Sequence, residues 1–279
     1  MIVPAGIYLF LNFGTPTQSG AGIPMATDIA FAIGILSLLG NRVPTSLKIF
    51  LTALAVIDDL GAIMVIAIFY TKSISFYHLG IAMGIWVVLL ILNRLKIRNL
   101  IPYLVGGFIM WYFMMQTGIH ATITGVLVAF AIPFGNGDEK STSYILQDFL
   151  HYPVAFFILP LFALANTCIP LGNHLIPSLL HANSIGIILG LVIGKPLGIV
   201  LFSLLGVGIG LCTLPSDLKW KNIIGAGFLG GIGFTMSIFI TLLAFDDTEV
   251  INHSKIAILV ASLLAGCIGF FFLKFTLKK

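Results

Sequence analysis

Charged side chains are scarce in this sequence. Asp, Glu, Lys and Arg make up only 9% of its 279 residues, whereas soluble globular domains carry about 25%. The loops between the apolar stretches are short, and none is a low-complexity linker. This composition excludes a cytosolic enzyme and a nucleic-acid-binding protein, although the net charge is +4.

Cysteine is also rare. Cys168, Cys212 and Cys267 lie far apart, without metal-ligand or redox spacing, so we interpret them as small apolar side chains. A disulfide scaffold is therefore excluded. The first residues lack a basic region and a small-residue cleavage site, so we do not expect a signal peptide.

Apolar residues, in contrast, are abundant. They make up 59% of the chain, and the mean hydropathy is +1.12. Because a membrane-spanning helix needs about 20 apolar residues, we predict an all-α polytopic membrane protein with a single transmembrane domain over residues 1–279. About nine spans are predicted by apolar runs, near residues 21–40, 46–70, 76–93, 100–116, 118–134, 149–170, 183–206, 222–245 and 254–275. The stretch from Met1 to Phe13 is too short to cross and is interpreted as a partial N-terminal span.

Basic residues are distributed unequally between the two sides of these spans. One side holds eleven of them: Arg42, Lys48, Arg94, Lys96, Arg98, Lys140, Lys219, Lys221, Lys274, Lys278 and Lys279. The other side holds only Lys72 and Lys255, with Asp246, Asp247 and Glu249. The positive-inside rule places the first side in the cytoplasm, and the C-terminus with it.

Four charged residues lie inside predicted spans: Asp28, Asp58, Asp59 and Lys195. Lys195 is about 16 Å from either end of its span, too far for its side chain to reach the interface. Each such charge costs about 2.5–3.5 kcal/mol on insertion scales, so the four cost about 10–14 kcal/mol. Buried structural ion pairs are the alternative to a functional site, but three acids and one base leave a surplus that pairing cannot cover.

Asp58 and Asp59 are adjacent within one span. Adjacent helical residues point about 100° apart, so the two carboxylates cannot face the same way. Burial disfavours the ionised form of a carboxylate, and such a group binds either a proton or a hard cation. Competition between these ions for one site is sufficient for cation/proton exchange.

Two of the spans are interrupted. Pro24 lacks a backbone donor and clashes with the preceding turn, so we expect the first span, which contains Asp28, to break near its middle. A late span is interrupted by the glycines of Gly230–Gly233. Broken spans in both halves of a chain indicate a transport site, although small residues also serve ordinary helix packing. An acid such as Asp28 can offset the positive N-terminus of a half-helix, and a base such as Lys195 the negative C-terminus.

Five motifs, taken in order, resemble those of the NhaA family of bacterial sodium/proton antiporters. They are Ala26-Thr27-Asp28-Ile29-Ala30-Phe31-Ala32, Ile57-Asp58-Asp59-Leu60-Gly61-Ala62, Gly118-Ile119-His120-Ala121-Thr122, Gly194-Lys195-Pro196-Leu197-Gly198 and Gly230-Gly231-Ile232-Gly233-Phe234-Thr235-Met236-Ser237-Ile238-Phe239. The resemblance runs from Met1 to near Phe271. The rule about broken spans was itself drawn partly from this family, so it is not independent support.

The resemblance implies an inverted-repeat fold with two discontinuous helices that cross at mid-membrane. The matching residues at this helix crossing would be Thr27, Gly230, Gly231, Gly233 and Thr235. It also implies electrogenic exchange of sodium or lithium for protons, favoured at alkaline pH, in the bacterial inner membrane. Sodium or lithium and protons are then substrates, the lipid bilayer is the surrounding partner, and neither a cofactor nor a nucleic acid is expected.

Roles for the mid-span charges follow from the same resemblance. Asp59 would bind sodium or lithium, with Asp58 beside it. Asp28 and Lys195 would supply compensating charge at the half-helix ends. Alternatively, Lys195 would form a proton-labile ion pair with Asp58.

The sequence departs from the family pattern in two places. The family has about three further helices before the first residue of this chain, including the hairpin that forms its dimer, so a homodimer is left open. The family's pH-response cluster also matches poorly around Asp138, Glu139 and His151. His151 and His120 are candidate pH-responsive residues, and a solvated or backbone-bonded histidine is the alternative for each.

Three other functions compete with antiport. A non-transporting truncated remnant would bind only a partner or an ion. A sodium-coupled organic-anion symporter would need additional mid-span polar groups for its solute, and the sequence has no surplus of them. An intramembrane aspartyl protease would need two carboxylates facing each other from different helices, whereas Asp58 and Asp59 share one helix. We therefore predict a transporter and not an enzyme.

Overall fold

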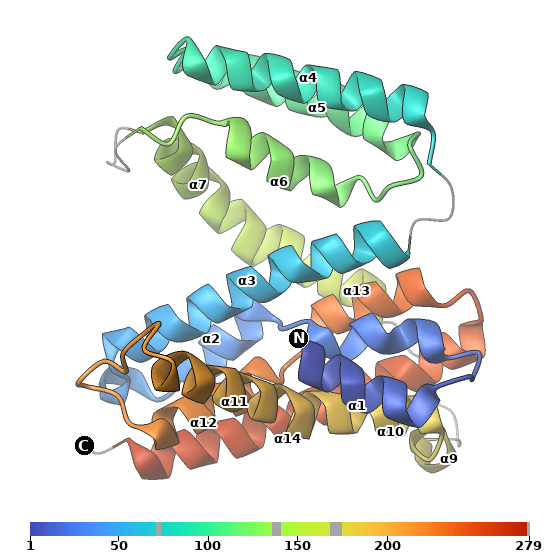
Figure 1. The fold of residues 1–279 in the computed structure, drawn as a ribbon, viewed down its shortest axis with the longest axis vertical. Coiled ribbons are helices and arrows are strands. Elements are labelled where there is room, and N and C mark those ends of the chain that lie inside the picture. The colour runs from blue at the N-terminus through green and yellow to red at the C-terminus, as the bar shows by residue number, and fades with distance from the viewer. Residues whose placement is uncertain (71–73, 136–140, 168–174, 278–279) are drawn as a thin grey trace. The chain divides into compact units, whose positions relative to one another are not determined.

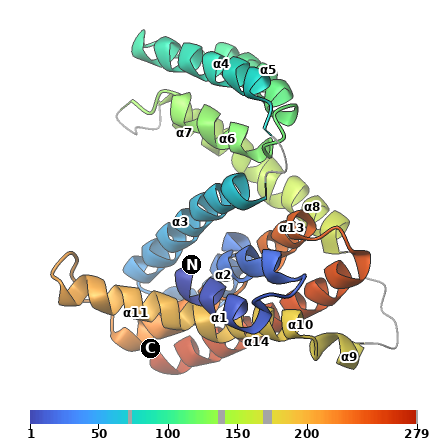
Figure 2. The ribbon, with the colours of Figure 1, turned by 45° about the vertical axis from the view of Figure 1, so that its right-hand side comes forward.

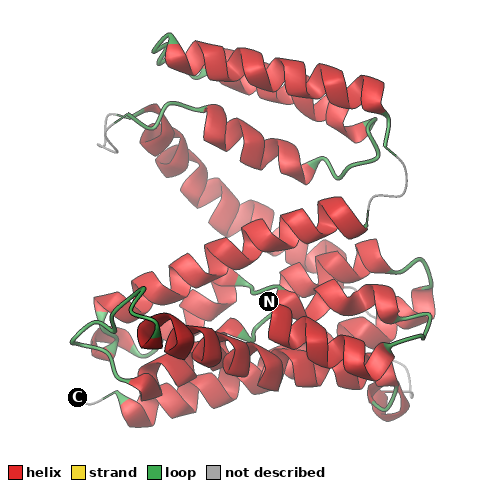
Figure 3. Cartoon of the chain, viewed as in Figure 1, coloured by secondary structure: helices red, strands yellow, loops and turns green. Residues whose placement is uncertain are grey.

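The computed structural model describes residues 1–70, 74–135, 141–167 and 175–277 as helices joined by loops (Figure 1; Figure 3). No strand occurs in these ranges. The predicted all-α class is therefore confirmed. The chain divides into two units, Met1–Ala62 with Ala165–Lys279 and Ile63–Leu164.

The first unit holds both chain ends and most of the helices. Its elements are α1 (Ile2–Asn12), the 3-10 helix η1 (Gln18–Met25), α2 (Ile29–Ser37), the 3-10 turn η2 (Gly40–Arg42), most of α3 (Thr45–Phe69), α9 (Leu175–Leu179), α10 (Ala182–Leu189), the π-helical turn η4 (Gly190–Gly194), α11 (Lys195–Gly208), α12 (Trp220–Gly230), α13 (Phe234–Ala244) and α14 (Thr248–Thr276). Its hydrophobic core contains buried residues of α2, α3, α11, α12 and α14, such as Leu36, Leu51, Leu229 and Leu273.

The second unit contains the end of α3 and the helices that follow it. These are α4 (Phe76–Arg94), α5 (Ile101–Met115), α6 (Thr122–Ala131), α7 (Thr142–Pro153), the π-helical turn η3 (Val154–Ile158) and most of α8 (Leu159–Thr167). Helices α4 and α5 lie side by side as an antiparallel pair (Figure 2). The indole N–H of Trp86 donates to the carbonyl of Leu127 at 2.8 Å and joins α4 to α6.

Most of the predicted spans have helical counterparts of sufficient length. Among the described residues, six helical segments are long and apolar enough to cross a membrane: Gln18–Ser37, Thr45–Phe69, Phe76–Arg94, Thr142–Thr167, Ala182–Gly208 and Thr248–Thr276. The bent pair α12 and α13 makes a seventh. The predicted N-terminal partial span is the 11-residue helix α1.

Helices α5 and α6 are shorter than the spans predicted near 100–116 and 118–134. They have 15 and 10 residues, fewer than the roughly 20 that a straight crossing needs. The physical reason lies in the backbone, because Gly118 has φ +83° and turns the chain between the two helices. Pro133 follows α6 and cannot supply the backbone donor that a continuing helix requires.

Glycines allow α1 to pack closely against η4 and α11. Gly190, Gly194 and Gly198 recur at every fourth position. A Cβ added at Gly194 would lie 2.8 Å from the Cα of Pro4, and one at Gly198 would lie 3.2 Å from the Cβ of Val3. These separations are shorter than ordinary carbon contacts. The stripe of small residues therefore brings two helix backbones together, as is common between helices in membranes.

Large apolar side chains are exposed on both units. Phe10 of α1, Phe108 of α5 and Phe156 of η3 are all more than two-thirds exposed. Such a surface suits hydrocarbon as the surrounding solvent.

Candidate ion site at the helix crossing

Two interrupted helical segments cross in the first unit. One runs through η1, breaks over residues 26–28 and continues as α2. The other runs through α12, breaks over residues 231–233 and continues as α13 with a bend of 46° (Figure 1). Their halves pack crosswise, because η1 contacts α13 and α2 contacts α12. Both predicted interruptions are present, and Pro24 lies just before the first.

The two breaks satisfy each other's backbone groups. The amide N–H of Asp28 donates to the carbonyl of Ile232 at 2.6 Å. The hydroxyl of Thr27 donates to the carbonyl of Gly230, the last residue of α12, at 2.8 Å. Helix ends leave such groups without intrahelical partners, and leaving them unpaired in an apolar environment is costly. The crossing therefore replaces helical hydrogen bonds with bonds between the breaks.

Asp28 lies at the N-termini of two helices. Its Oδ1 accepts from the N–H of Phe31 at 3.2 Å and so caps α2. Its Oδ2 accepts from the N–H of Thr235 at 3.1 Å, in the first turn of α13, and from the Thr235 hydroxyl. The side chain is buried. One carboxylate therefore faces the partial positive charges of both helix N-termini.

Asp58 and Lys195 form a buried ion pair. Lys195 Nζ contacts Oδ2 of Asp58, and the two residues are only 1% and 6% exposed. Lys195 Nζ also donates to Oγ1 of Thr27 at 2.8 Å, and this hydroxyl lies 3.1 Å from the same Asp58 oxygen. The single hydroxyl proton of Thr27 can go either to Asp58 or to the carbonyl of Gly230. Thr27 thus links the ion pair to the end of α12.

Lys195 lies near the middle of the segment Ala182–Gly208. It is the first residue of α11, directly after the wide turn η4. A buried ammonium is tolerated only with a counter-ion and further hydrogen bonds, because its desolvation costs several kcal/mol. Asp58 and Thr27 supply both in this structure.

Asp59 follows Asp58 on α3, but its environment is different. Its Oδ1 is buried and has no hydrogen-bond partner within the described part of the chain. The charges of Asp58, Asp28 and Lys195 act on this carboxylate. A buried oxygen without a donor is unfavourable, and three acids near one base leave a surplus of negative charge. This oxygen therefore offers a place for a proton or a cation.

The glycines of the second break differ in what surrounds them. A Cβ added at Gly231 would lie 3.1 Å from the carbonyl oxygen of Phe228 and closer still to that of Leu191. These obstacles are backbone atoms, which cannot move aside. A Cβ at Gly230 or Gly233 would instead meet side-chain atoms, such as Cδ1 of Ile199 at 3.0 Å from Gly230. Because the backbone of η4 approaches so closely, position 231 requires glycine more strongly than positions 230 and 233 do.

The two candidate pH-responsive histidines belong to the second unit. His120 is half-buried between α5 and α6, and His151 is exposed on α7, where its ring contacts that of Tyr152. Asp138 and Glu139, the acids considered with His151, lie outside the described residues. The acids and the lysine of the crossing all come from the first unit. His120 and His151 are therefore not among the described residues of the first unit that form the candidate ion site.

Sequence reasoning missed polar residues that support the crossing. The Ser237 hydroxyl donates to the carbonyl of Ile23 at 2.8 Å and ties α13 to η1. The Tyr8 hydroxyl donates to Oδ1 of Asn183 at 2.6 Å, and Nδ2 of Asn183 donates to Ser254 at 2.7 Å, which joins α1, α10 and α14. The sequence does show these residues as isolated polar positions within apolar runs. It does not show which residues they contact, because their partners are distant in sequence.

The geometry can be compared with known proteins. A sequence profile of the family described as Na+/H+ antiporter 1 matches residues 1–273. The chain belongs to this antiporter family. It is 71% identical over 279 residues to the Na(+)/H(+) antiporter NhaA of Flavobacterium psychrophilum, and the match covers all of this chain and 73% of the relative.

Further NhaA relatives agree. The chain is 65% identical over 279 residues to the Na(+)/H(+) antiporter NhaA of Cytophaga hutchinsonii, with 100% of this chain and 72% of the relative covered. It is 62% identical over 277 residues to that of Dechloromonas aromatica, with 98% and 71% covered. The resemblance to the NhaA family that the motifs indicated is confirmed. With its apolar helices, the chain is a multi-pass membrane protein with an all-α, NhaA-like fold.

Proposed function

We propose that this chain exchanges sodium, or lithium, for protons across the bacterial inner membrane. The observation that carries the proposal is the buried Oδ1 of Asp59, which has no partner among the described residues and lies next in sequence to the Asp58–Lys195 ion pair. The names of the NhaA relatives support the choice of ions. The substrates are the transported ions themselves, and we propose neither a cofactor nor a catalysed chemical reaction.

Asp59 is proposed as the exchanged ligand. In an apolar environment an unpaired carboxylate is unfavourable, so it holds either a proton or a cation. Sodium is a hard cation that prefers oxygen ligands, and Asp58, the Thr27 hydroxyl, backbone carbonyls and water could complete its coordination. Binding of sodium requires the carboxylate to lose its proton. The two ions therefore exclude each other at this site, which is the requirement for antiport.

The Asp58–Lys195 pair is proposed to release a second proton. When the Asp58 carboxylate turns toward the cation, Lys195 loses its counter-ion in a buried position. An ammonium without a partner is unfavourable there, so the amine gives up its proton. More than one proton would then move for each sodium ion. Exchange would be electrogenic, and it would be favoured at alkaline pH because protons compete less with sodium.

Asp28 is proposed to support the site without binding the transported ion. Its two oxygens are already engaged by donors from α2 and α13. Its negative charge offsets the two helix N-termini at the crossing. It therefore holds the two breaks in the geometry that places Thr27 against the ion pair.

The orientation is proposed from the distribution of basic residues. The side that carries Arg42, Lys48, Arg94, Lys219 and Lys221 would face the cytoplasm. The C-terminus would then also be cytoplasmic. Cysteine labelling from either side of intact cells, at a position such as Lys274→Cys, tests this assignment.

Sodium-driven pH changes in everted membrane vesicles that contain the chain test the proposed exchange. Asp59→Asn is expected to abolish the signal and Asp58→Asn to reduce it at least about tenfold, because each removes a charge that must bind an ion. Asp148→Asn, a matched change at an exposed position of α7, should leave the signal unchanged. Full exchange in Asp59→Asn would refute the proposed role.

The competing transport function is separated by a second measurement on the same vesicles. Sodium-dependent uptake of a labelled organic anion would indicate a symporter instead. A voltage-sensitive dye tests the electrogenic step, because exchange of unequal charges responds to an imposed membrane potential. Exchange that is indifferent to the potential would contradict release of the second proton.

A further inference from the structure

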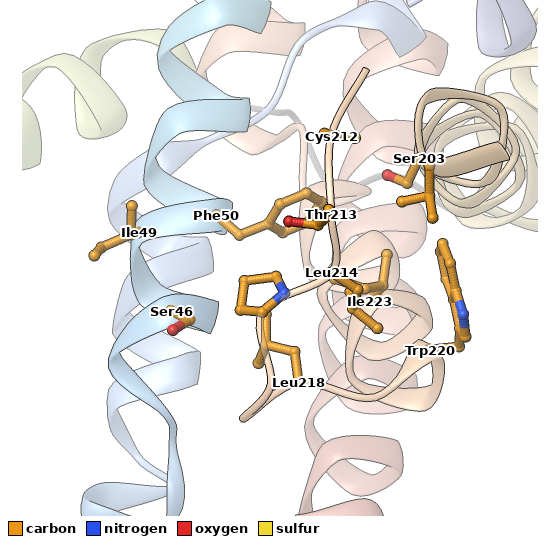
Figure 4. Close-up of a pocket in the computed structure, with 12 residues that line it drawn as sticks. Ser46, Ile49, Phe50, Ser203, Cys212, Thr213, Leu214, Leu218, Trp220 and Ile223 are labelled. Carbon is orange, nitrogen blue, oxygen red and sulfur yellow. The ribbon is translucent and has the colours of Figure 1, made fainter. Parts of the chain in front are cut away.

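A groove of about 530 Å³ lies in the first unit, and Figure 4 shows the side chains that line it. It is formed where the start of α3, the end of α11, the loop over residues 209–219 and the start of α12 meet. Its walls are mostly apolar, with Ile49 and Phe50 on one side and Trp220 and Ile223 on another. None of the four charges of the ion site lines it.

The walls of the groove are held by specific contacts. The hydroxyl of Ser46, in the first turn of α3, donates to Oδ2 of Asp217 at 2.8 Å and ties the loop to the helix. Within the loop, the N–H of Leu218 donates to the carbonyl of Pro215 at 3.0 Å, and Leu218 is buried in the core of the unit. The groove is therefore part of the packed structure of this unit.

Basic side chains surround this part of the unit. Lys219 and Lys221 flank Trp220 in sequence and are exposed, and Lys48 is exposed next to Ile49. In the segments that line the groove, residues 46–50 and 203–223, the one acid is Asp217, which accepts the hydrogen bond from Ser46. The surroundings of the groove therefore carry excess positive charge.

We propose that this groove seats one acyl chain of an anionic phospholipid whose headgroup binds Lys219 and Lys221. Lysine binds phosphate as a point charge, and basic residues beside a membrane attract anionic lipids. Tryptophan is enriched at the boundary between hydrocarbon and headgroups, where its ring has one apolar and one polar side. Trp220, between the two lysines and against the groove, has the position that this arrangement requires.

The bound lipid would connect two helices that lead to the ion site. Helix α3 begins at the groove and carries Asp58 and Asp59 further along, while α12 begins there and ends at the break after Gly230. A lipid in the groove would hold the starts of both helices together. The proposal does not depend on which ions the protein moves, so its test is separate from that of exchange.

Native mass spectrometry of the purified full chain in detergent tests headgroup selectivity. Phosphatidylglycerol and phosphatidylcholine with identical acyl chains are compared. We expect phosphatidylglycerol to bind at least about tenfold more tightly, since two lysines act on an anionic headgroup. The double variant Lys219→Gln/Lys221→Gln should bind it no better than phosphatidylcholine, whereas Lys96→Gln, exposed in the second unit, should behave as the unmodified chain. Equal binding of both lipids, or selectivity retained in the double variant, would overturn the proposal.

Fluorescence quenching tests where the acyl chain lies. Phosphatidylglycerol with brominated acyl chains should quench part of the tryptophan emission, and that part should be absent in Trp220→Phe. Ser203→Phe, which places a ring in the groove, should abolish the same part of the quenching. Unchanged quenching in both variants would mean that the acyl chain of the lipid binds outside the groove. The chain could instead show no preference between the lipids and a dimer population that is smaller in Ser203→Phe. That result would identify a second copy of the chain as the occupant of the groove and would also reject the proposal.

Discussion

The carboxylate of Asp28 accepts a hydrogen bond from the backbone N–H of Thr235 at 3.1 Å, although 207 positions of the sequence separate them. Each residue lies at an interrupted helix, and Asp28 also caps α2. The bond therefore fixes the two breaks relative to each other. With the breaks held, Thr27 reaches both the end of α12 and the Asp58–Lys195 pair.

Removing one partner of the buried ion pair should cost more stability than removing both. Asp58→Asn leaves the Lys195 ammonium buried without a counter-ion, and loss of one partner of such a pair costs about 3–5 kcal/mol. In Asp58→Asn/Lys195→Met both charges of the pair are removed and neither is left facing an uncharged partner, so most of this loss should be recovered. Thermal unfolding of the purified variants in detergent measures the difference. If the double variant unfolded at a lower temperature than Asp58→Asn alone, the proposed pairing of Asp58 with Lys195 would be contradicted.

The hydroxyl of Thr27 should matter more than its methyl group. Thr27→Val keeps the shape but leaves Lys195 and the carbonyl of Gly230 each without one hydrogen bond. We expect a loss of about 1–3 kcal/mol of stability, together with slower sodium-driven exchange. Thr27→Ser retains the hydroxyl and should stay close to the unmodified chain in both measurements. If Thr27→Ser were as impaired as Thr27→Val, packing and not hydrogen bonding would explain the residue.

A methyl group at position 231 should not fit. In Gly231→Ala the new Cβ would meet the carbonyl oxygens of Leu191 and Phe228, and overpacking of this kind costs about 1–3 kcal/mol. Gly34→Ala is the matched control, because no atom of the described residues lies within 4 Å of a Cβ there. Gly34 is within α2, so alanine should stabilise the chain by up to about 1 kcal/mol. Melting temperatures of the two variants should therefore shift in opposite directions.

Stabilisation by sodium should weaken as the pH falls. Ligand binding to the folded state raises the melting temperature, and sodium binds only the deprotonated site. Below the pKa of the site, the apparent Kd for sodium should rise about tenfold for each unit by which the pH falls, for each proton that sodium must displace. Melting temperatures with and without sodium, over a pH series and with potassium as the control, measure this. A pH-independent shift, or an undiminished shift in Asp59→Asn, would contradict competition at Asp59.

Much of the fold could be predicted because hydropathy and helix breakers act locally. Apolar runs located the long helices, and both interruptions followed from Pro24 and from the glycines of Gly230–Gly233. The lengths of α5 and α6 could not be predicted in the same way. The sequence around Gly118 remains apolar, and hydropathy does not report that its backbone turns at φ +83°.

The candidate site was predicted as a set of residues but not as a set of contacts. Burial of charge identified Asp58 and Lys195, yet whether the lysine would balance a helix end or pair with the acid stayed open. That choice depends on how α11 is rotated toward α3, which is a tertiary property. Likewise, only the placement of the neighbouring groups shows that Oδ1 of Asp59 has no hydrogen-bond partner among the described residues. The same holds for Ser237, whose partner Ile23 is 214 positions away.

The π-helical turn η4 contains one residue more than the helix would need there. A π turn holds one more residue than an α turn of the same helix, and η4 ends immediately before Lys195. Deleting a single residue within Gly190–Gly194 would let an ordinary α-helix form, because four residues in α geometry turn through nearly the same total angle as the five residues of η4. Lys195 would then still face Asp58. Over evolution, loss of one residue should consequently be tolerated better within η4 than within α10, where it would rotate the following residues by about 100°.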